Sequence, residues 1–167
     1  HRLRGVLRRF ALRRLHKHNP DKIAKAISAT VTRCQKLGYL DDDAFAKSQA
    51  RSHRLQGRSK IGIRQRLRQH RLDDNIIDVA LDAADQHTKN SELLAACLFA
   101  RRRRLGPFDR REYEDTNDRE TNIRRQLGSL ARAGFNRAIS YTVIELENMH
   151  AAEILIDQLK KGEDIKI

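Results

Sequence analysis

Apolar residues recur at intervals of three or four positions along most of the chain, and they fall into six groups. These are Ile23, Ala26, Ile27, Val31 and Cys34; Ile63 and Leu67; Ile76, Ile77, Ala80, Leu81 and Ala84; Leu94, Cys97, Leu98 and Leu105; Ile123 and Leu127; and Ile139, Val143 and Leu146. This spacing places each group on one face of an α-helix, and no segment sustains the two-residue alternation of a half-buried strand. The pattern predicts an all-α protein.

The order of the predicted helices repeats, which indicates tandem units of three helices each. In the middle unit, Phe45 and Ala46 open a first helix, residues 63–67 lie in a second, and residues 72–76 begin a third. Three pairs of segments correspond between the middle and last units: 45–46 with 99–100, 63–67 with 123–127, and 72–76 with 135–139. Each of these two units is therefore expected to be a three-helix element.

The first unit is shorter than the other two. Ile23 and Ile27 match Ile76 and Ala80, so this unit contains the equivalent of the last helix of the repeat. Because the chain begins at His1, we expect that the true N-terminus and the opening helix of this unit are missing.

The repeat divides the chain into four segments. We predict a first, truncated repeat at 1–40, a second three-helix repeat at 41–88, a third at 89–150 with a loop insertion at 106–121, and a helical tail at 151–167. The insertion is placed there because the last unit is the longer one and this segment combines Pro107 with mixed charge. We expect it to be an exposed loop.

The segment after the first unit predicts a junction between two helices. Gly38 can end one helix in the left-handed conformation, and Asp41 or Asp42 can cap the next. The structural motif that we assign to this junction comprises Gly38, Tyr39, Leu40, Asp41, Asp42 and Phe45. We expect its aromatic side chains and its leucine to pack in the core, as isolated aromatics at helix junctions usually do.

The chain is strongly basic, with 35 Lys and Arg against 22 Asp and Glu, a net charge of +13 and a pI near 10.4. The stretch 44–72 holds nine Lys and Arg and no acid. A helical projection places Lys60, Arg64, Arg68 and Arg71 on one stripe beside the apolar face. No acidic partner lies one turn away within this helix, which favours contact with a polyanion over a solvated face.

Two further basic segments widen this picture. Residues 1–17 are either a nucleic-acid-binding arm or a helix with an exposed basic face. Four successive arginines at 101–104 surround a helix, so Arg101, nearest the apolar face, is expected to be partly structural. The predicted contacts with a polyanionic partner are Arg51, Arg54, Lys60, Arg64, Arg68, Arg71, Arg102, Arg103 and Arg124.

Composition and spacing argue against catalysis, metal binding and a membrane span. Cys34 and Cys97 continue apolar stripes and are expected to be buried thiols in a reducing cytoplasm. We find no metal-ligand spacing, no cofactor motif and no catalytic arrangement, and a nuclease would need an acidic cluster that is not evident. Aromatics make up only 5% of residues, which favours recognition of phosphates or a protein surface over stacking on bases.

Several of these segments together resemble the regulatory protein RecX family, and in particular its alphaproteobacterial members. The matching segments are 37–42 with 45–46, Gly57 before 63–67, 76–81, 101–107 and 130–135. The resemblance covers about Leu7 to Glu147. The chain departs from the family where a second Gly and a Pro usually follow Gly57, and where His70-Arg71-Leu72 replaces Lys-Gly-Ile. Loss of the glycine of Lys-Gly-Ile, where this chain has Arg71, would remove an easy left-handed cap at a cost of about 1 kcal/mol.

The resemblance implies a fold and a function. The fold would be an elongated, curved array of tandem three-helix repeats. The function would be non-catalytic: binding of RecA filaments in their helical groove and modulation, mainly inhibition, of recombinase, ATPase and co-protease activity in DNA repair and the SOS response. We expect a cytoplasmic monomer without cofactors, whose partners are the RecA filament and, weakly and electrostatically, single- and double-stranded DNA. The alternative is an independent, sequence-non-specific nucleic-acid-binding protein without RecA dependence.

Overall fold

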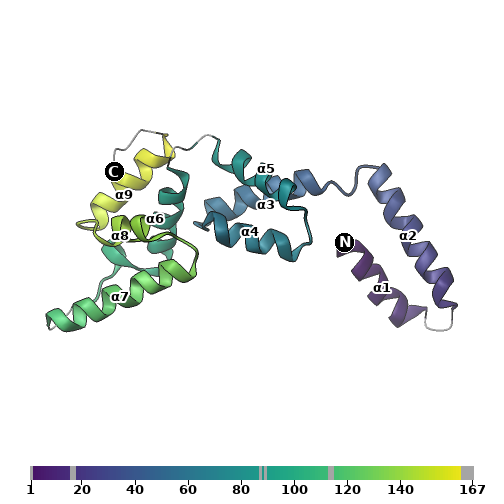
Figure 1. Ribbon diagram of the computed structural model, residues 1–167, viewed down its shortest axis with the longest axis horizontal. Coiled ribbons are helices and arrows are strands. Elements are labelled where there is room, and N and C mark those ends of the chain that lie inside the picture. The colour runs from purple at the N-terminus through teal and green to yellow at the C-terminus, as the bar shows by residue number, and fades with distance from the viewer. Residues whose placement is uncertain (1, 16–17, 87, 89, 113–114, 163–167) are drawn as a thin grey trace.

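The computed structural model describes residues 2–15, 18–86, 88, 90–112 and 115–162 as helices joined by turns (Figure 1). The elements are α1 (Arg2–Arg14), α2 (Pro20–Lys36), α3 (Asp42–Leu55), α4 (Lys60–Gln69), α5 (Asp74–Asp85), α6 (Ser91–Arg103), the 3₁₀ turn η1 (Gly106–Phe108), α7 (Thr116–Arg132), α8 (Arg137–Ile144) and α9 (Met149–Lys160). The described residues contain no strand, which confirms the all-α prediction. No described helix is both long and apolar enough to cross a bilayer.

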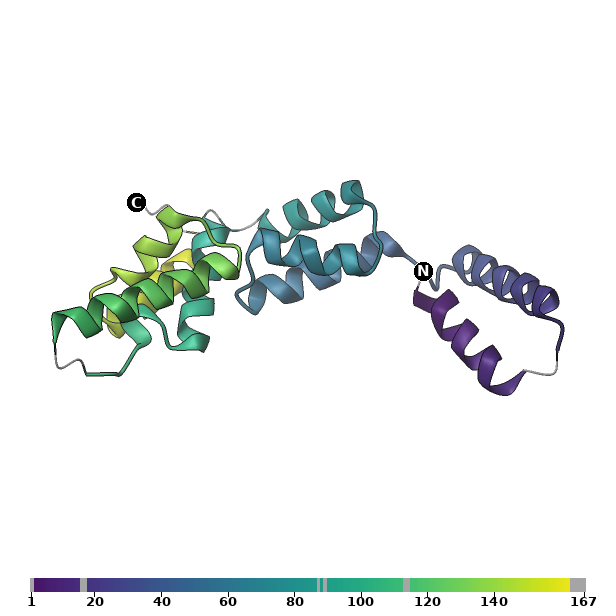
Figure 2. The ribbon, with the colours of Figure 1, turned by 60° about the horizontal axis from the view of Figure 1, so that its bottom comes forward.

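The helices form three units that follow one another along the long axis of the molecule (Figures 1 and 2). A hairpin of α1 and α2 lies at one end, the bundle α3–α5 in the middle, and the bundle α6–α9 at the other end. Each unit has its own hydrophobic core, and these three cores are separate clusters. The elongated array of helical units agrees with the fold predicted from the repeat.

Polar side chains fix where most of the helices begin. The capping residues are Asn19, Asp41, Ser59, Asp73, Asp115, Asn136 and Asn148, each of which accepts a hydrogen bond from a backbone N–H of the first turn. Of the two caps considered for α3, Asp41 is the one used, through Ala44 N at 2.8 Å. These bonds satisfy donors that the helix itself leaves free.

The first unit has the thinnest core. Apolar residues of α1 at four-residue intervals pack on Ile27 and Val31 of α2, and only three residues of the cluster, Ala11 among them, are buried. Residues 2–14 are therefore a packed helix whose arginines Arg4, Arg8 and Arg9 are exposed, and their role as a nucleic-acid-binding arm stays a prediction.

The junction motif after α2 agrees with the prediction in part. Gly38 adopts the left-handed conformation, with φ of 72°, and Leu40 packs against the first core. Phe45 is half-buried, with its ring edge-on to His70 at 5.3 Å between ring centres. The prediction that Tyr39 is a core residue is wrong, because its side chain is 76% exposed.

The third unit differs from its predicted boundaries at two places. Residues 151–160 are not a tail, because α9 buries Ala152, Ile156 and Leu159 completely in the core of this unit. The loop at 106–121 is shorter than predicted, since Phe108 is buried and α7 already begins at Thr116.

The buried face of α7 also differs from the apolar stripe in the sequence. Asn122 and Gln126 are buried together with Leu130, whereas Ile123 and Leu127 lie half-buried beside them. The two buried amides donate hydrogen bonds to the same carboxylate oxygen, Asp109 Oδ2, at 3.0 and 2.7 Å. This polar network ties the segment after η1 to α7. Of the two predicted buried thiols, Cys97 is buried and Cys34 is half-buried.

Candidate polyanion-binding surface

The basic stripe predicted on α4 is real, but it faces the acidic helix α5. Lys60 Nζ lies 3.4 Å from Asp85 Oδ2, Arg68 Nε lies 2.8 Å from Asp74 Oδ1, and Arg64 is ion-paired with Asp78. Lys60 Nζ also lies 3.6 Å from Asp82 Oδ1. Lys60, Arg64 and Arg68 follow one another every four residues, as do Asp74, Asp78 and Asp82, so the two rows run along adjoining faces of two packed helices. The helix α4 has no acidic residue to pair with these cations, and α5 supplies the acidic partners instead.

Arg54 is a buried structural residue rather than a surface contact. Only 8% of its side chain is exposed, and its guanidinium binds Asp85 Oδ1 at 2.8 Å and Glu92 Oε2 at 2.6 Å. Burial alone would lower the pKa of this guanidinium, but the hydrogen bonds and charges of the two carboxylates raise it above its ordinary value. Because Glu92 belongs to α6, Arg54 links the second unit to the third. Its predicted role as a partner contact is not compatible with this burial.

A cleft of about 300 Å³ lies where the second and third units meet, and we call it the junction cleft. It is lined by Gly57, Arg58, Ser59, Gly62, Gln65, Arg66, Gln69, Phe99, Arg102, Arg132 and Ala133. Four of these residues are arginines, and none of the described lining residues is acidic. Burial, followed by the nearby charges of Arg66 and Arg102, lowers the pKa of Arg58 below its ordinary value.

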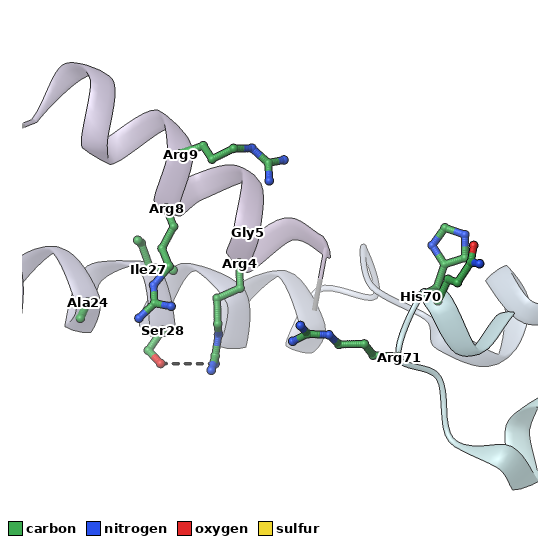
Figure 3. A pocket seen from close by; sticks show the side chains of 10 residues that line it. Arg4, Gly5, Arg8, Arg9, Ala24, Ile27, Ser28, His70 and Arg71 are labelled. Atoms are coloured by element: carbon green, nitrogen blue, oxygen red, sulfur yellow. Dashed lines mark hydrogen bonds between the residues drawn. The ribbon is translucent and has the colours of Figure 1, made fainter. Parts of the chain in front are cut away.

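A second cleft, of about 800 Å³, lies between the first and second units, and we call it the N-terminal cleft (Figure 3). Arg4, Arg8 and Arg9 enter it from α1, and Arg71 extends toward them from the turn after α4. The one hydrogen bond drawn in Figure 3 runs from Arg4 Nη2 to Ser28 Oγ at 3.4 Å. Here too the described lining residues include no carboxylate. Arg71 itself has a left-handed backbone, with φ of 58°, at the position where the family usually has glycine.

The remaining predicted contacts lie at several places. Arg102 is in the junction cleft, where its Nη1 donates to Gln56 O at 2.8 Å and its guanidinium carbon lies 5.8 Å from the centre of the Phe99 ring. Arg103 lies over the same ring, at 5.9 Å. Arg51 is exposed, and Arg124 is exposed with Glu120 at 3.7 Å. The role of these residues as contacts stays a prediction.

The predicted contacts left out six of the arginines that line the two clefts. Arg4, Arg8 and Arg9 lie in the segment 1–17, which was considered only as a candidate nucleic-acid-binding arm, and Arg58, Arg66 and Arg132 were not singled out. A signal for one of them was present, because Asp74, Asp78 and Asp82, spaced four residues apart, can neutralise only one face of α4. Arg66, two residues from Arg64 and therefore on the opposite face, is left out of that pairing.

The arrangement defines a class of protein: an elongated helical-repeat protein with acid-free arginine clefts between its units. The described residues hold no group of three or more His, Cys, Asp or Glu side chains that could bind a metal ion. Residues 41–81, within the middle unit, match the RecX second three-helix domain. Together with the relatives below, this match places the chain in the RecX family.

Three curated relatives, each named regulatory protein RecX, show the extent of the similarity. The protein of Myxococcus xanthus is 39% identical over 119 residues, which is 71% of this chain and 60% of the relative. That of Mycolicibacterium vanbaalenii is 35% identical over 132 residues, 77% of this chain and 66% of the relative. That of Agrobacterium fabrum is 28% identical over 155 residues, 93% of this chain and 78% of the relative.

The matches to the first two relatives span 60% and 66% of their length, so less than two thirds of each is represented here. These relatives come from different bacteria, and the matches do not test the narrower expectation of an alphaproteobacterial member. No solved structure matches the chain significantly.

Proposed function

We propose that this protein is a non-catalytic regulator that binds RecA filaments on DNA and modulates, mainly by inhibition, their recombinase, ATPase and co-protease activities. Membership of the RecX family supports this assignment. The structural observation that carries it is the pair of arginine clefts, free of described acidic residues, that follow one another along an elongated array. A protein of this shape can lie along a groove and present cations to a repeating anionic surface.

In the proposed mode of action, the helical array lies in the filament groove as a monomer and bridges neighbouring RecA subunits. Bridging would alter filament growth and ATP turnover without chemistry by the regulator itself. The acidic row of α5 does not oppose this binding, because α4 neutralises it. Among the contacts predicted from sequence, Arg51, Arg71, Arg102 and Arg103 are the ones that we propose for this surface.

A second function is favoured by the charge of the clefts alone: binding of nucleic acid without any need for RecA. The excess of 13 positive charges would give such a protein affinity for any nucleic acid, with a steep dependence on salt. The two functions differ in what they require, since the first needs a filament and the second only DNA.

The test is to measure RecA ATPase on single-stranded DNA while this protein is titrated in at fixed, moderate salt. Fluorescence anisotropy follows binding to the same DNA without RecA. The proposal expects ATPase to fall at protein concentrations too low to coat the naked DNA. If ATPase falls only when the naked DNA is saturated, the protein competes for DNA and the second function holds instead.

A further inference from the structure

The two sides of α4 carry the same kind of residue in opposite electrostatic settings. Arg64 and Arg68 are paired with Asp78 and Asp74 across the contact with α5. Arg66, on the opposite side, lines the junction cleft, and no ion pair joins it to a described residue. Like charges that lie close together without counter-ions destabilise a fold. The four arginines of the junction cleft therefore indicate that the cleft binds an anionic partner.

The junction cleft is held in one shape by close backbone contacts. Gly57 has φ of 70°, and a side chain there would meet Phe99 N at 2.7 Å and Ala95 O at 2.9 Å. Ser59 Oγ donates to Ala133 O and accepts from Gly62 N, which joins the start of α4 to the end of α7. The arginines are therefore carried by elements whose relative positions are fixed before any partner arrives.

Polar atoms in and beside the cleft lack partners. Arg58 Nε is a buried donor without an acceptor among the described residues, and His53 Nδ1, on the adjoining helix α3, is buried without a hydrogen-bond partner there. A buried donor without an acceptor costs free energy that an anion in the cleft would recover. Arg102 is held in place by Gln56 O and by the Phe99 ring, which fixes its guanidinium at the rim.

We propose that the junction cleft is a binding site for the phosphodiester backbone of nucleic acid, formed by Arg58, Arg66, Arg102 and Arg132. The guanidinium fork matches the oxygens of a phosphate, and several forks side by side can bind successive phosphates of one strand. Gln65 and Gln69 add amide donors of the kind that contact phosphate and sugar. The assignment deepens the proposed function by naming where DNA is held, and it rests on that function only for its biological setting.

The site recognises the backbone and not the bases. The aromatic residue in the cleft, Phe99, is 8% exposed and covered by Arg102 and Arg103, so it offers no face for stacking. Binding is therefore independent of sequence and dominated by release of counter-ions.

The test compares two double variants of the intact chain by anisotropy with a fluorescent single-stranded oligonucleotide at several NaCl concentrations. The cleft variant is Arg58→Gln with Arg66→Gln. The matched control is Arg64→Gln with Arg68→Gln, which removes the same number of positive charges from the opposite side of α4. The cleft variant is expected to bind roughly tenfold more weakly, with a salt slope smaller by about 1.4, which corresponds to two phosphate contacts. The control is expected to change affinity by less than about twofold.

Equal losses in the two variants would overturn the site, because the loss would then follow net charge alone. Competition identifies the ligand: poly-glutamate that displaces the oligonucleotide at equal charge concentration would assign the cleft to an acidic protein surface. Inorganic phosphate that displaces it as well as an oligonucleotide competitor does would assign the cleft to free phosphate. Either result would overturn the proposal.

A measurement on the unaltered protein keeps the proposal testable even if a variant fails to fold. Burial, followed by the charges of Arg58 and Arg66, lowers the pKa of His53; His70 adds to this, and a hydrogen bond with Gln56 opposes it. A phosphate between the two arginines offsets their charge, so NMR titration should show this pKa rising toward its ordinary value when the oligonucleotide binds. No change at saturation would contradict the site. Neither experiment contains RecA. A negative result would therefore overturn the cleft as a DNA-binding site without contradicting the proposed regulation of RecA, which the ATPase measurement tests separately.

Discussion

The turns that end α2 and α3 share one backbone conformation but lie in different surroundings. The turn after α2 connects the first unit to the second, whereas the turn after α3 lies inside the second unit and packs against α6 of the third. After α2, Gly38 is left-handed and Tyr39 N donates to Cys34 O at 2.9 Å; after α3, Gly57 is left-handed and Arg58 N donates to His53 O at 3.1 Å. Around Gly38 nothing lies within 4 Å of the position a Cβ would take. Around Gly57, α6 lies closer than a Cβ would allow.

The difference extends to the charges. Arg54 joins Asp85 of the second unit to Glu92 of the third, whereas between the first and second units no extensive helix packing is present among the described residues. The second and third units are thus expected to behave as one body, and the first to be attached through a connector that can turn. The same left-handed turn can therefore lie in an open connector or in a close contact between units, depending on what the tertiary structure packs against it.

The largest effect is expected at the ion pairs that join the second and third units. Arg54→Ala should lower the free energy of unfolding by about 3–5 kcal/mol, because it removes a buried guanidinium and leaves the half-buried carboxylates of Asp85 and Glu92 without the cation that joins them. Urea denaturation followed by circular dichroism measures this. Arg51→Ala, an exposed arginine on the same helix, is the control and should change the value by less than about 0.5 kcal/mol. A loss at Arg54 no larger than in this control would show that the joint does not depend on the pairs.

The two left-handed glycines that follow α2 and α3 provide the next comparison. Gly57→Ala should destabilise by about 2–4 kcal/mol, because left-handed strain adds to a clash with the backbone of α6. Gly38→Ala should cost only the left-handed strain, about 1–2 kcal/mol, since the space around it is open. Thermal and urea unfolding of both variants measure the difference. Equal losses would mean that the closeness of Gly57 to α6 has no energetic weight.

The two cysteines report on the units at either end. Cys97 is fully buried in the third unit, and burial raises the pKa of its thiol to about 12, while Cys34 in the first unit is half-buried. At pH 8 a maleimide reagent should label Cys34 at least about tenfold faster than Cys97, because only local opening exposes the latter. Mass spectrometry of the C34S and C97S single-thiol variants measures each rate. Similar rates in native buffer, rather than only in denaturant, would contradict a firmly packed third unit.

The smallest effect is expected from the pH dependence beside the contact between the second and third units. Burial, then the charges of Arg58 and Arg66, hold the pKa of His53 below its ordinary value of 6.5. The unfolded chain therefore binds more protons at this residue, and the free energy of unfolding should fall as the pH drops below about 6.5. His53→Gln should weaken this fall, as seen in urea titrations between pH 5 and 8. A steeper fall in the variant would reverse the assigned sign.

Much of the fold was available from local patterns. The period of the apolar residues indicated the helices, and the pair Asp41 and Asp42 indicated where α3 begins, because both signals depend on residues within one turn. The left-handed turn at Gly38 was predicted for the same reason. The part of the candidate site that could be predicted was its character, a basic surface without chemistry of its own, together with Arg102 and Arg71 as cleft residues.

What the sequence by itself determined is thus the set of helices, their order and the excess of positive charge. Only the tertiary structure decided which charges are free, because pairing depends on which helix packs beside which: α5 neutralises Lys60, Arg64 and Arg68 and leaves Arg66 in a cleft. It also decided that Tyr39 is exposed and that α9 completes a core, since burial depends on neighbours distant in the chain. Local periodicity records which face of a helix is apolar, but not what will cover it.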